Sequence, residues 1–356
     1  MENNEKEIIT EEVPKKKKKK KSVWKIIRNF FLILICLAIF IGSVGVLLYP
    51  MISNMYSDQM QSQVRTAYEK KLAEIDESEF VEAKRLADEY NAVLAGVTTE
   101  AFSEEYLESL RSDYNKLLNL TGDGLMGYVE VPIINVYLPV YHGNTGNEVD
   151  DAAALEQGVV HLFGTSPPVG GKNTHAAMSA HTGMANNKLF TDLEALKEGD
   201  VFYLHVLNET LAYEVCNIAV VEPYDTSLLG VYKGQDYVTL ITCTPYGVNS
   251  HRLLVRGTRI PYEEAKKVEV VQHETREVTS QWNKQYMKGI LYGLGLVVSV
   301  LLILILVHFL SKKMKEKMKE EEAKETEEVE EDSENSEQTG VVIVDGTEEE
   351  KEDPVE

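Results

Sequence analysis

Two long stretches of this chain contain no charged side chain, and they constrain its fold more than any other feature. They cover residues 29–51 and 289–311. A helix needs about 20 apolar residues to cross the hydrocarbon core of a bilayer, so both stretches are long enough. A cleaved signal peptide is the alternative for the first, but its apolar run is too long and no small-x-small cleavage site follows before Tyr49-Pro50. We therefore expect two transmembrane helices.

One lysine cluster comes just before the first stretch and another just after the second. They indicate how the chain crosses the membrane. Residues 15–21 are all Lys, and five lysines occur within residues 312–319. Lys-rich flanks stay in the cytoplasm, so we expect both termini to be cytoplasmic and residues 52–288 to lie outside the cell. An N-terminal lysine run can also be a nuclear signal or a nucleic-acid-binding arm, but its position against a membrane span favours anchoring.

The net charge of −22 is concentrated at one end of the chain. Residues 320–356 hold 18 Asp and Glu against 2 Lys, whereas the basic N-terminus, residues 1–28, holds 10 Lys and Arg against 5 Glu. The region between the two stretches offers no basic patch, so no nucleic-acid partner is expected. The acidic tail, residues 312–356, is expected to be disordered and cytoplasmic.

The region between the apolar stretches changes character near residue 122. Before it, in a helical or lid segment at 52–121, apolar residues recur at helical spacing. After it, short runs rich in β-branched and aromatic residues alternate with Gly, Pro and Asn. Many short strands with turn signals favour a closed barrel or a sandwich over residues 122–262, so the fold class is mainly β. Residues 263–288 are then an extracellular linker.

Three cysteines are too few for a disulfide framework, and they differ in their surroundings. Cys36 lies in the first apolar stretch, and Cys216 follows a strand-like run in which a small thiol is usually buried by packing. Cys243 ends the apolar run 239–242 and precedes a turn with Pro and Gly. A strand end is a rigid place for a nucleophile, although an isolated Cys there is more often a core residue.

Two other residues suit catalysis at Cys243. Arg252 lies nine residues on, in a strand-like run that a turn through residues 246–250 would fold back beside the cysteine. A guanidinium there can stabilise a thiolate or a developing oxyanion. His181 ends another strand-like run, although a single histidine can equally be a surface group. No metal-binding cluster or phosphate-binding loop is apparent, so no cofactor is expected.

Several motifs resemble those of the sortase family. Residues 239–243 read TLITC, which is similar to the TLxTC signature of sortases, with Arg252 and His181 at the places of the family's arginine and histidine. Four segments resemble class C sortases, the pilin polymerases: Gly127–Pro132, Leu138–Gly143, Gly170–His175 and Thr242–Gly247. The similarity covers about residues 122–262, and two membrane spans are also usual in that class.

This resemblance implies an eight-stranded sortase β-barrel on the surface of a Gram-positive cell. The thiolate of Cys243 would attack the Thr–Gly bond of an LPxTG-like sorting signal, and an amine would resolve the thioacyl intermediate. Cys243 is then the nucleophile, His181 the general acid and base, and Arg252 the donor to the oxyanion. The substrates would be LPxTG-type surface proteins or pilins, and the amine would come from a pilin lysine or a cell-wall precursor.

The chain departs from class C sortases at two places. Many of them carry an Asp-Pro-aromatic lid before the barrel, where this chain has Glu-Ala-Phe at residues 100–102. After the histidine, where Arg is common, it has Thr182. Glu100 and Phe102 are accordingly interpreted as a lid over the cysteine. The alternative is that Glu100 merely begins a helix.

Three other functions remain open from the sequence. A sortase that attaches surface proteins to a cell-wall precursor would use the same chemistry with a different amine. A non-catalytic surface protein or pilin tethered by two spans is less favoured, because no LPxTG sequence precedes the second apolar stretch. A cysteine peptidase would release the acyl group to water, and a test with an amine acceptor separates it from a transpeptidase.

Overall fold

The computed structural model describes residues 21–96, 111–143 and 147–337. Its helices and strands are α1 (Lys21–Leu72), α2 (Glu77–Gly96), β1 (Leu125–Val131), η1 (Pro132–Ile134), β2 (Val136–His142), α4 (Glu148–Gln157), β3 (Val159–His161), β4 (Thr174–Ser179), η2 (Leu193–Ala195), β5 (Val201–Val206), β6 (Glu209–Val221), β7 (Asp236–Thr244), β8 (His251–Ile260), α5 (Tyr262–Thr275) and α6 (Gln281–Glu337). The lid candidates Glu100 and Phe102 lie outside the described residues. The chain divides into two compact units, residues 1–290 and 291–356, and the first contains all the described strands.

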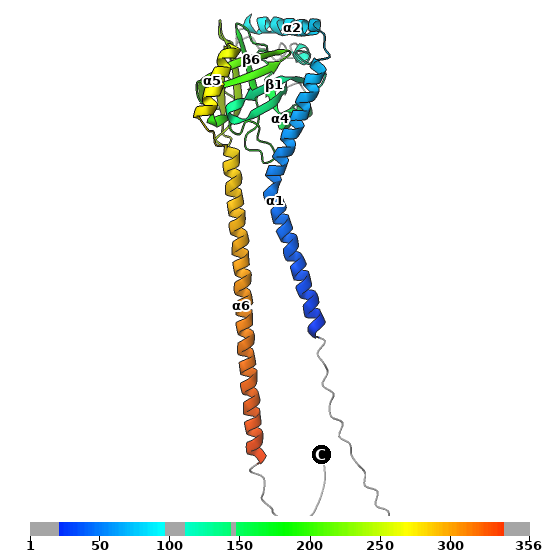
Figure 1. Ribbon diagram of the computed structural model, residues 1–356, viewed down its shortest axis with the longest axis vertical. Helices are drawn as coiled ribbons and strands as arrows, with labels where there is room; N and C mark the ends of the chain where they lie inside the picture. The colour runs from blue at the N-terminus through cyan, green and yellow to red at the C-terminus, as the bar shows by residue number, and fades with distance from the viewer. Residues whose placement is uncertain (1–20, 97–110, 144–146, 338–356) are drawn as a thin grey trace, which may run out of the picture. The chain divides into compact units, whose positions relative to one another are not determined.

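Eight strands form one closed barrel in the order β1-β2-β3-β4-β7-β8-β6-β5 (Figure 1). The barrel closes because β1 pairs with both β2 and β5. Most neighbours are antiparallel, but β2 and β3 are parallel, as are β4 and β7. The prediction of a mainly β domain is confirmed, and of the two architectures that the strand pattern allowed, the barrel is present.

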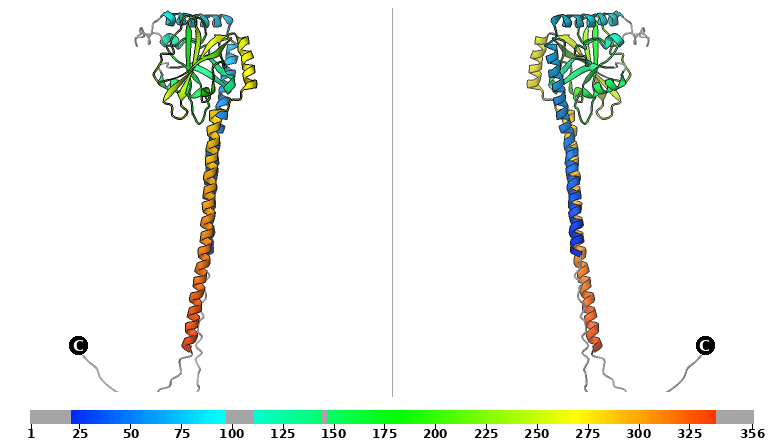
Figure 2. Two further views of the ribbon diagram at one scale, coloured as in Figure 1. Left: turned by 90° about the vertical axis from the view of Figure 1, so that its left-hand side faces the viewer. Right: turned by 90° about the vertical axis from the view of Figure 1, so that its right-hand side faces the viewer.

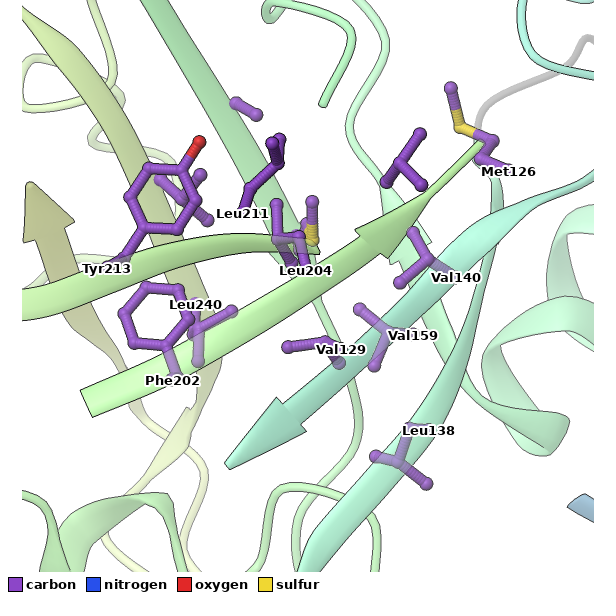
Figure 3. Packing of buried hydrophobic residues seen from close by; sticks show 14 of the residues in the cluster. Met126, Val129, Leu138, Val140, Val159, Phe202, Leu204, Leu211, Tyr213 and Leu240 are labelled. Carbon is purple, nitrogen blue, oxygen red and sulfur yellow. The ribbon is translucent and has the colours of Figure 1, made fainter. Parts of the chain in front are cut away.

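Alternate residues of the strands point into the barrel and form its core, which includes Val129 and Leu240 (Figure 3). Phe202 stacks on Tyr213 there, with ring centroids 5.5 Å apart. Gly257 leaves room for this pair, since a Cβ at that position would lie 2.5 Å from the Phe202 ring and 2.9 Å from Cβ of Tyr213. Two stacked rings therefore require a glycine on β8, because protein interiors are close-packed.

The helical residues before the barrel pack against it. α2 places Ala87, Tyr90 and Leu94 in the main core cluster, and Figure 2 shows this helix lying across one end of the barrel. Tyr68 of α1 is buried against β1, where its hydroxyl donates a hydrogen bond of 3.2 Å to the carbonyl of Met126. The helical segment predicted before the barrel is thus present among the described residues.

Two helices were not predicted from the sequence. α4 forms the crossover that the parallel strands β2 and β3 require, and Asn147 caps it by accepting from the amide of Val149. α5 occupies the start of the predicted extracellular linker and packs Ala265 against Val201 and Tyr203. Neither helix shows a strong apolar stripe, because α4 buries no residue fully and α5 buries only Ala265.

Both uncharged stretches are helical, and α6 continues beyond the second one to Glu337, so the expectation of a disordered tail is wrong for residues 312–337. The helices Phe30–Leu72 and Gln281–Glu321 are long and apolar enough to cross a membrane, and the apolar part of each buries none of its residues inside the protein. α1 passes through Pro50, near the end of the apolar stretch, and continues to Leu72. The first apolar stretch and the start of the helical segment are therefore one helix rather than two.

Candidate active site

Cys243 and Arg252 are paired residues of one β-hairpin. β7 and β8 are antiparallel, and their register places Cys243 opposite Arg252. The carbonyl of Pro245 closes the connecting turn by accepting from the amide of Asn249. Gly247 and Asn249 have φ of 76° and 60°, a region that these two residue types adopt at little cost. The hairpin predicted from the sequence is present.

His181 follows β4, which pairs with β7 on the side opposite β8. It lies at the same height along the barrel wall as Cys243. β4 is parallel to β7, and Ser179 near its end lies opposite Ile241. Beyond that pair, the amide of Ala180 donates to the carbonyl of Ile241 over 3.1 Å. His181 is two residues beyond Ser179, and Cys243 is two residues beyond Ile241. The parallel register therefore brings the histidine beside the cysteine.

Cys243 and Arg252 lie on the outer face of the barrel wall. Leu240 and Val255 point into the core. Side chains alternate along a strand, so Cys243 and Arg252, each three residues away from one of them, point outward. The side chain of Cys243 is partly exposed. The structure thus gathers the three predicted site residues at one level of the adjacent strands β4, β7 and β8.

The guanidinium of Arg252 is anchored in the turn that follows Cys243. Its Nη1 donates to the backbone carbonyl of His251 over 3.1 Å and to that of Asn249 over 3.3 Å. An arginine side chain has five N–H donors in a planar fork and keeps its charge at any physiological pH. The site therefore contains a permanent cation, held by the same hairpin that carries the thiol.

His181 is half-buried, and this affects its protonation. Burial lowers the pKa of its imidazole below the usual 6.5, while the carboxylate of Glu156 acts in the opposite direction. The ring is therefore mainly neutral at pH 7, and a neutral imidazole can accept a proton from a thiol. The backbone carbonyl of His181 accepts from the amide of Phe190 over 3.1 Å, which ties the following loop to the end of β4.

Polar contacts join the loop after His181 to the end of β7. The hydroxyl of Thr244 donates to Oε1 of Glu194 over 2.5 Å, and within the loop the amide of Gly183 donates to Thr191 Oγ1 over 3.1 Å. Thr182, which follows the histidine directly, is buried. These bonds limit how far the end of β4 can move relative to the end of β7.

An apolar cluster on the same outer face was not predicted from the sequence. Its buried members are Ala177, Ile241 and Leu254, and the partly buried side chains packed on them are Leu162, Val221, Leu228 and Leu229. Ile241 and Leu254 are the same-face neighbours of Cys243 and Arg252, two residues along each strand. Two-residue spacing could have identified these two. Leu228 and Leu229 come from the loop between β6 and β7, and only the fold places them here.

Cys216 lies away from this site. It occurs at a bulge of β6, between Val215 and Asn217, and its Sγ donates to the carbonyl of Arg256 over 3.4 Å. In the barrel, β8 separates β6 from β7. The expectation that Cys216 is buried is wrong: its side chain is exposed, since a bulge breaks the alternation of the strand.

Arg256 shares the outer face with Arg252 but has different neighbours. Its guanidinium carbon lies 4.9 Å from the centre of the Tyr237 ring and 5.3 Å from that of the Tyr232 ring. Its partner on β7 is Thr239. Of the two arginines, Arg252 is the one that the strand register places opposite the cysteine.

Comparison with known proteins relates this chain to one family. The family model described as "Sortase domain" matches residues 129–260. Sortase A of Staphylococcus aureus is 34% identical over 122 residues, and sortase A of Bacillus anthracis is 27% identical over 164 residues. These matches cover 34% and 44% of this chain, and 55% and 73% of the relatives. The chain thus spans about half the length of the Staphylococcus aureus protein.

This chain also matches a solved structure. The crystal structure of sortase C1 from Streptococcus agalactiae is 40% identical to this chain and superimposes with a TM-score of 0.51. The superposition covers 56% of this chain and 98% of that one.

Proposed function

Because this chain belongs to the sortase family and is similar to class C sortases, we propose that it is a membrane-anchored cysteine transpeptidase with Cys243 as its nucleophile. One observation carries the proposal: Cys243 is paired with Arg252 across β7 and β8, and His181 follows β4, the strand that is parallel to β7 on its other side. A thiol, a permanent cation and a titratable imidazole are the groups that acyl transfer through a thioester requires.

In the first half-reaction, the sulfur of Cys243 attacks the carbonyl carbon of the scissile peptide and His181 accepts the thiol proton. Arg252 donates hydrogen bonds to the oxyanion that develops on the carbonyl oxygen. The carbon–nitrogen bond then breaks, and His181 gives its proton to the leaving amine. The acyl group remains on Cys243 as a thioester.

In the second half-reaction an amine replaces the one that left. His181, now neutral, removes a proton as the amine nitrogen attacks the thioester, and Arg252 again binds the oxyanion. The carbon–sulfur bond breaks and the sulfur of Cys243 takes up the proton. Water in place of the amine would give a free acid, so excluding water from the thioester favours transfer over hydrolysis.

We propose that the substrate is an LPxTG-like sorting signal, cut between Thr and Gly. The apolar cluster supports this choice, because it lies beside Cys243 and keeps Leu228 and Leu229 partly exposed. An apolar surface next to the thiol suits the Leu and Pro of such a signal, whose burial is favourable.

For the acceptor we propose a pilin lysine. The support is the 40% identity to a sortase C1 over nearly all of that chain, together with the class C motifs of the sequence. Attachment of surface proteins to a cell-wall precursor is the second candidate. The chemistry at Cys243 is the same for either amine.

The proposed function requires a membrane topology and a domain organisation. We propose that residues 29–51 and 289–311 cross the membrane, that both termini are cytoplasmic, and that the barrel at 122–262 faces outward. Two helices of suitable length and the lysines flanking them support this arrangement.

Mass spectrometry of the full chain in detergent, incubated with an LPxTG-type peptide, tests the proposal. We expect release of the glycine-containing fragment and an acyl adduct on Cys243. A pilin domain that offers a lysine should then be joined to the acyl group by an amide bond. Release of the free acid alone at every amine concentration would identify a peptidase instead, and absence of any adduct would contradict the proposal.

A further inference from the structure

One of the segments that resemble class C sortases, Gly170–His175, contains none of the three proposed catalytic residues. It leads into β4 at the end far from His181. Its residues contact the loop between β6 and β7, residues 222–235, which supplies Leu228 and Leu229 to the apolar cluster. The contacts of His175 and Asn173 in this motif show how that loop is held.

His175 is fully buried and uses both ring nitrogens. Nδ1 lies 2.8 Å from the carbonyl oxygen of Gly230, and Nε2 lies 2.7 Å from Oγ1 of Thr239. A carbonyl can only accept, so Nδ1 carries the proton, and the hydroxyl of Thr239 donates to Nε2. The ring is therefore a neutral imidazole in one fixed tautomer. Burial lowers its pKa to about 4, which keeps this form over the physiological range.

Asn173 binds the same loop one residue before its end. Its Oδ1 accepts from the amide of Gly234 over 2.7 Å, and the amide of Thr174 donates to the carbonyl of Gln235 over 3.1 Å. At the beginning of the loop, Glu222 lies 3.4 Å from His251 in an exposed pair. Exposed pairs contribute little, so the part-buried bond of His175 to Gly230 contributes more to the attachment of the loop than the pair of Glu222 and His251.

The bond to Gly230 lies directly after the leucines of the loop. Leu228 and Leu229 immediately precede Gly230 along the chain and pack against Ile241 and Leu254, the neighbours of the catalytic hairpin residues. A donor that fixes the carbonyl of Gly230 therefore fixes the chain direction at both leucines. It sets how much of the apolar cluster stays open beside Cys243.

We propose that His175 is a positioning residue: through the Nδ1–H bond to Gly230 it holds the leucines of the 222–235 loop in the place where the apolar residues of the substrate bind. The inference rests on the proposed function and names a residue that governs substrate binding rather than chemistry. A buried histidine with both nitrogens paired can also be a simple core residue, and the test separates the two roles.

The test compares three variants at position 175. In His175→Asn the amide nitrogen takes the place of Nδ1 and can still donate to Gly230, whereas in His175→Gln the amide reaches the place of Nε2 instead. His175→Ala keeps neither bond. Tyr224→Ala is the matched control, because Tyr224 lies in the same loop and is 95% exposed.

Three measurements are made on each full-length variant: KM and kcat for an LPxTG-type peptide, the rate of Cys243 alkylation by a small thiol reagent, and hydrogen exchange over residues 222–235. Loss of one neutral hydrogen bond should raise KM and loop exchange about tenfold in His175→Gln and His175→Ala. His175→Asn and Tyr224→Ala should behave like the wild type. The alkylation rate should not change in any variant.

Equal impairment of His175→Asn and His175→Gln would overturn the proposal, since volume rather than the donor would then matter. So would a faster-exchanging loop with an unchanged KM, or a parallel fall of alkylation and kcat. If the wild-type chain does not process the peptide, the proposed function fails by itself. The exchange data would still show whether the Nδ1–H donor holds the loop, and unchanged exchange in His175→Ala would reject that part.

Discussion

Arg252 stands opposite Cys243 in the β7–β8 hairpin, and two carbonyls of the same turn hold its guanidinium. The cation and the thiol therefore belong to one rigid unit, and no separate loop has to move to bring them together. A charge already in place where an oxyanion develops costs no reorganisation during the reaction.

The first prediction concerns the nucleophile. Cys243→Ala should abolish transpeptidation and leave the barrel folded, because the change removes only a partly exposed thiol. Cys216→Ala is the matched control, since this exposed cysteine lies on β6, and it should retain activity. Peptide turnover and circular dichroism check both. Loss of turnover in Cys216→Ala but not in Cys243→Ala would refute the assignment.

The second prediction concerns the arginine. Arg252→Ala should slow acylation by about two to three decades, the usual loss when one oxyanion donor is removed. His251→Ala should have little effect, because the contacts of its side chain with Glu222 and Ser250 are exposed. Single-turnover kinetics with the peptide measure the acylation rate. Arg256→Ala should do less than Arg252→Ala, and an equal loss would move the role of oxyanion donor along β8.

The third prediction concerns the protonation of His181. In a Cys243→Ala background, where the thiol cannot interfere, NMR should show a titration midpoint for His181 below 6.5, because burial disfavours the imidazolium. Glu156→Gln removes a carboxylate that raises this pKa, so the midpoint should fall further. A midpoint above 6.5, or a rise in Glu156→Gln, would contradict the electrostatics described for the site.

The fourth prediction concerns stability in acid. Burial lowers the pKa of His161 and of His175 to about 4, so between pH 6.5 and 4 the folded chain binds fewer protons than the unfolded chain. The free energy of unfolding should therefore fall as the pH falls through this window, by on the order of 3 kcal/mol per histidine. Denaturant unfolding at pH 7 and pH 4.5 measures it. Equal stability at both pH values would exclude this linkage.

The fifth prediction concerns topology. A protease added to intact protoplasts should digest residues 52–288 and spare an epitope placed after Glu356. The lysine clusters before the first apolar stretch and after the second should keep both termini in the cytoplasm. The control is permeabilised cells, in which the epitope should also be lost. Digestion of the epitope in intact protoplasts would show that the C-terminus is outside.

The elements that the sequence predicted well depend on local patterns. Short runs rich in β-branched and aromatic residues, separated by Gly, Pro and Asn, indicated β1, β2, β5 and β7, and the Pro-Gly turn after Cys243 implied the hairpin that brings Arg252 back. The two uncharged stretches needed only their length and composition. For these elements, the residues that decide the structure are neighbours along the chain.

The features that the sequence left out depend on contacts between distant segments. The parallel pairing of β4 with β7, which brings His181 to Cys243, joins strands that are about 60 residues apart. Leu228 and Leu229 reach the apolar cluster from the loop between β6 and β7, in which the carbonyl of Gly230 accepts a hydrogen bond from His175 on β4. The bulge that exposes Cys216 is likewise invisible without its partner strand β8.

α1 leaves the first apolar stretch and runs unbroken to Leu72, and its Tyr68 is bonded to β1. If residues 29–51 cross the membrane as proposed, this helix is a rigid connection between the membrane and the barrel. Its part beyond the span is roughly 30 Å long at 1.5 Å per residue. An enzyme held by such a helix stays close to the membrane and does not diffuse freely in the surrounding solution. It meets substrates that are themselves held in the bilayer, by lateral diffusion within one plane. The reaction rate should then follow the number of substrate molecules per unit of membrane area rather than their concentration in solution.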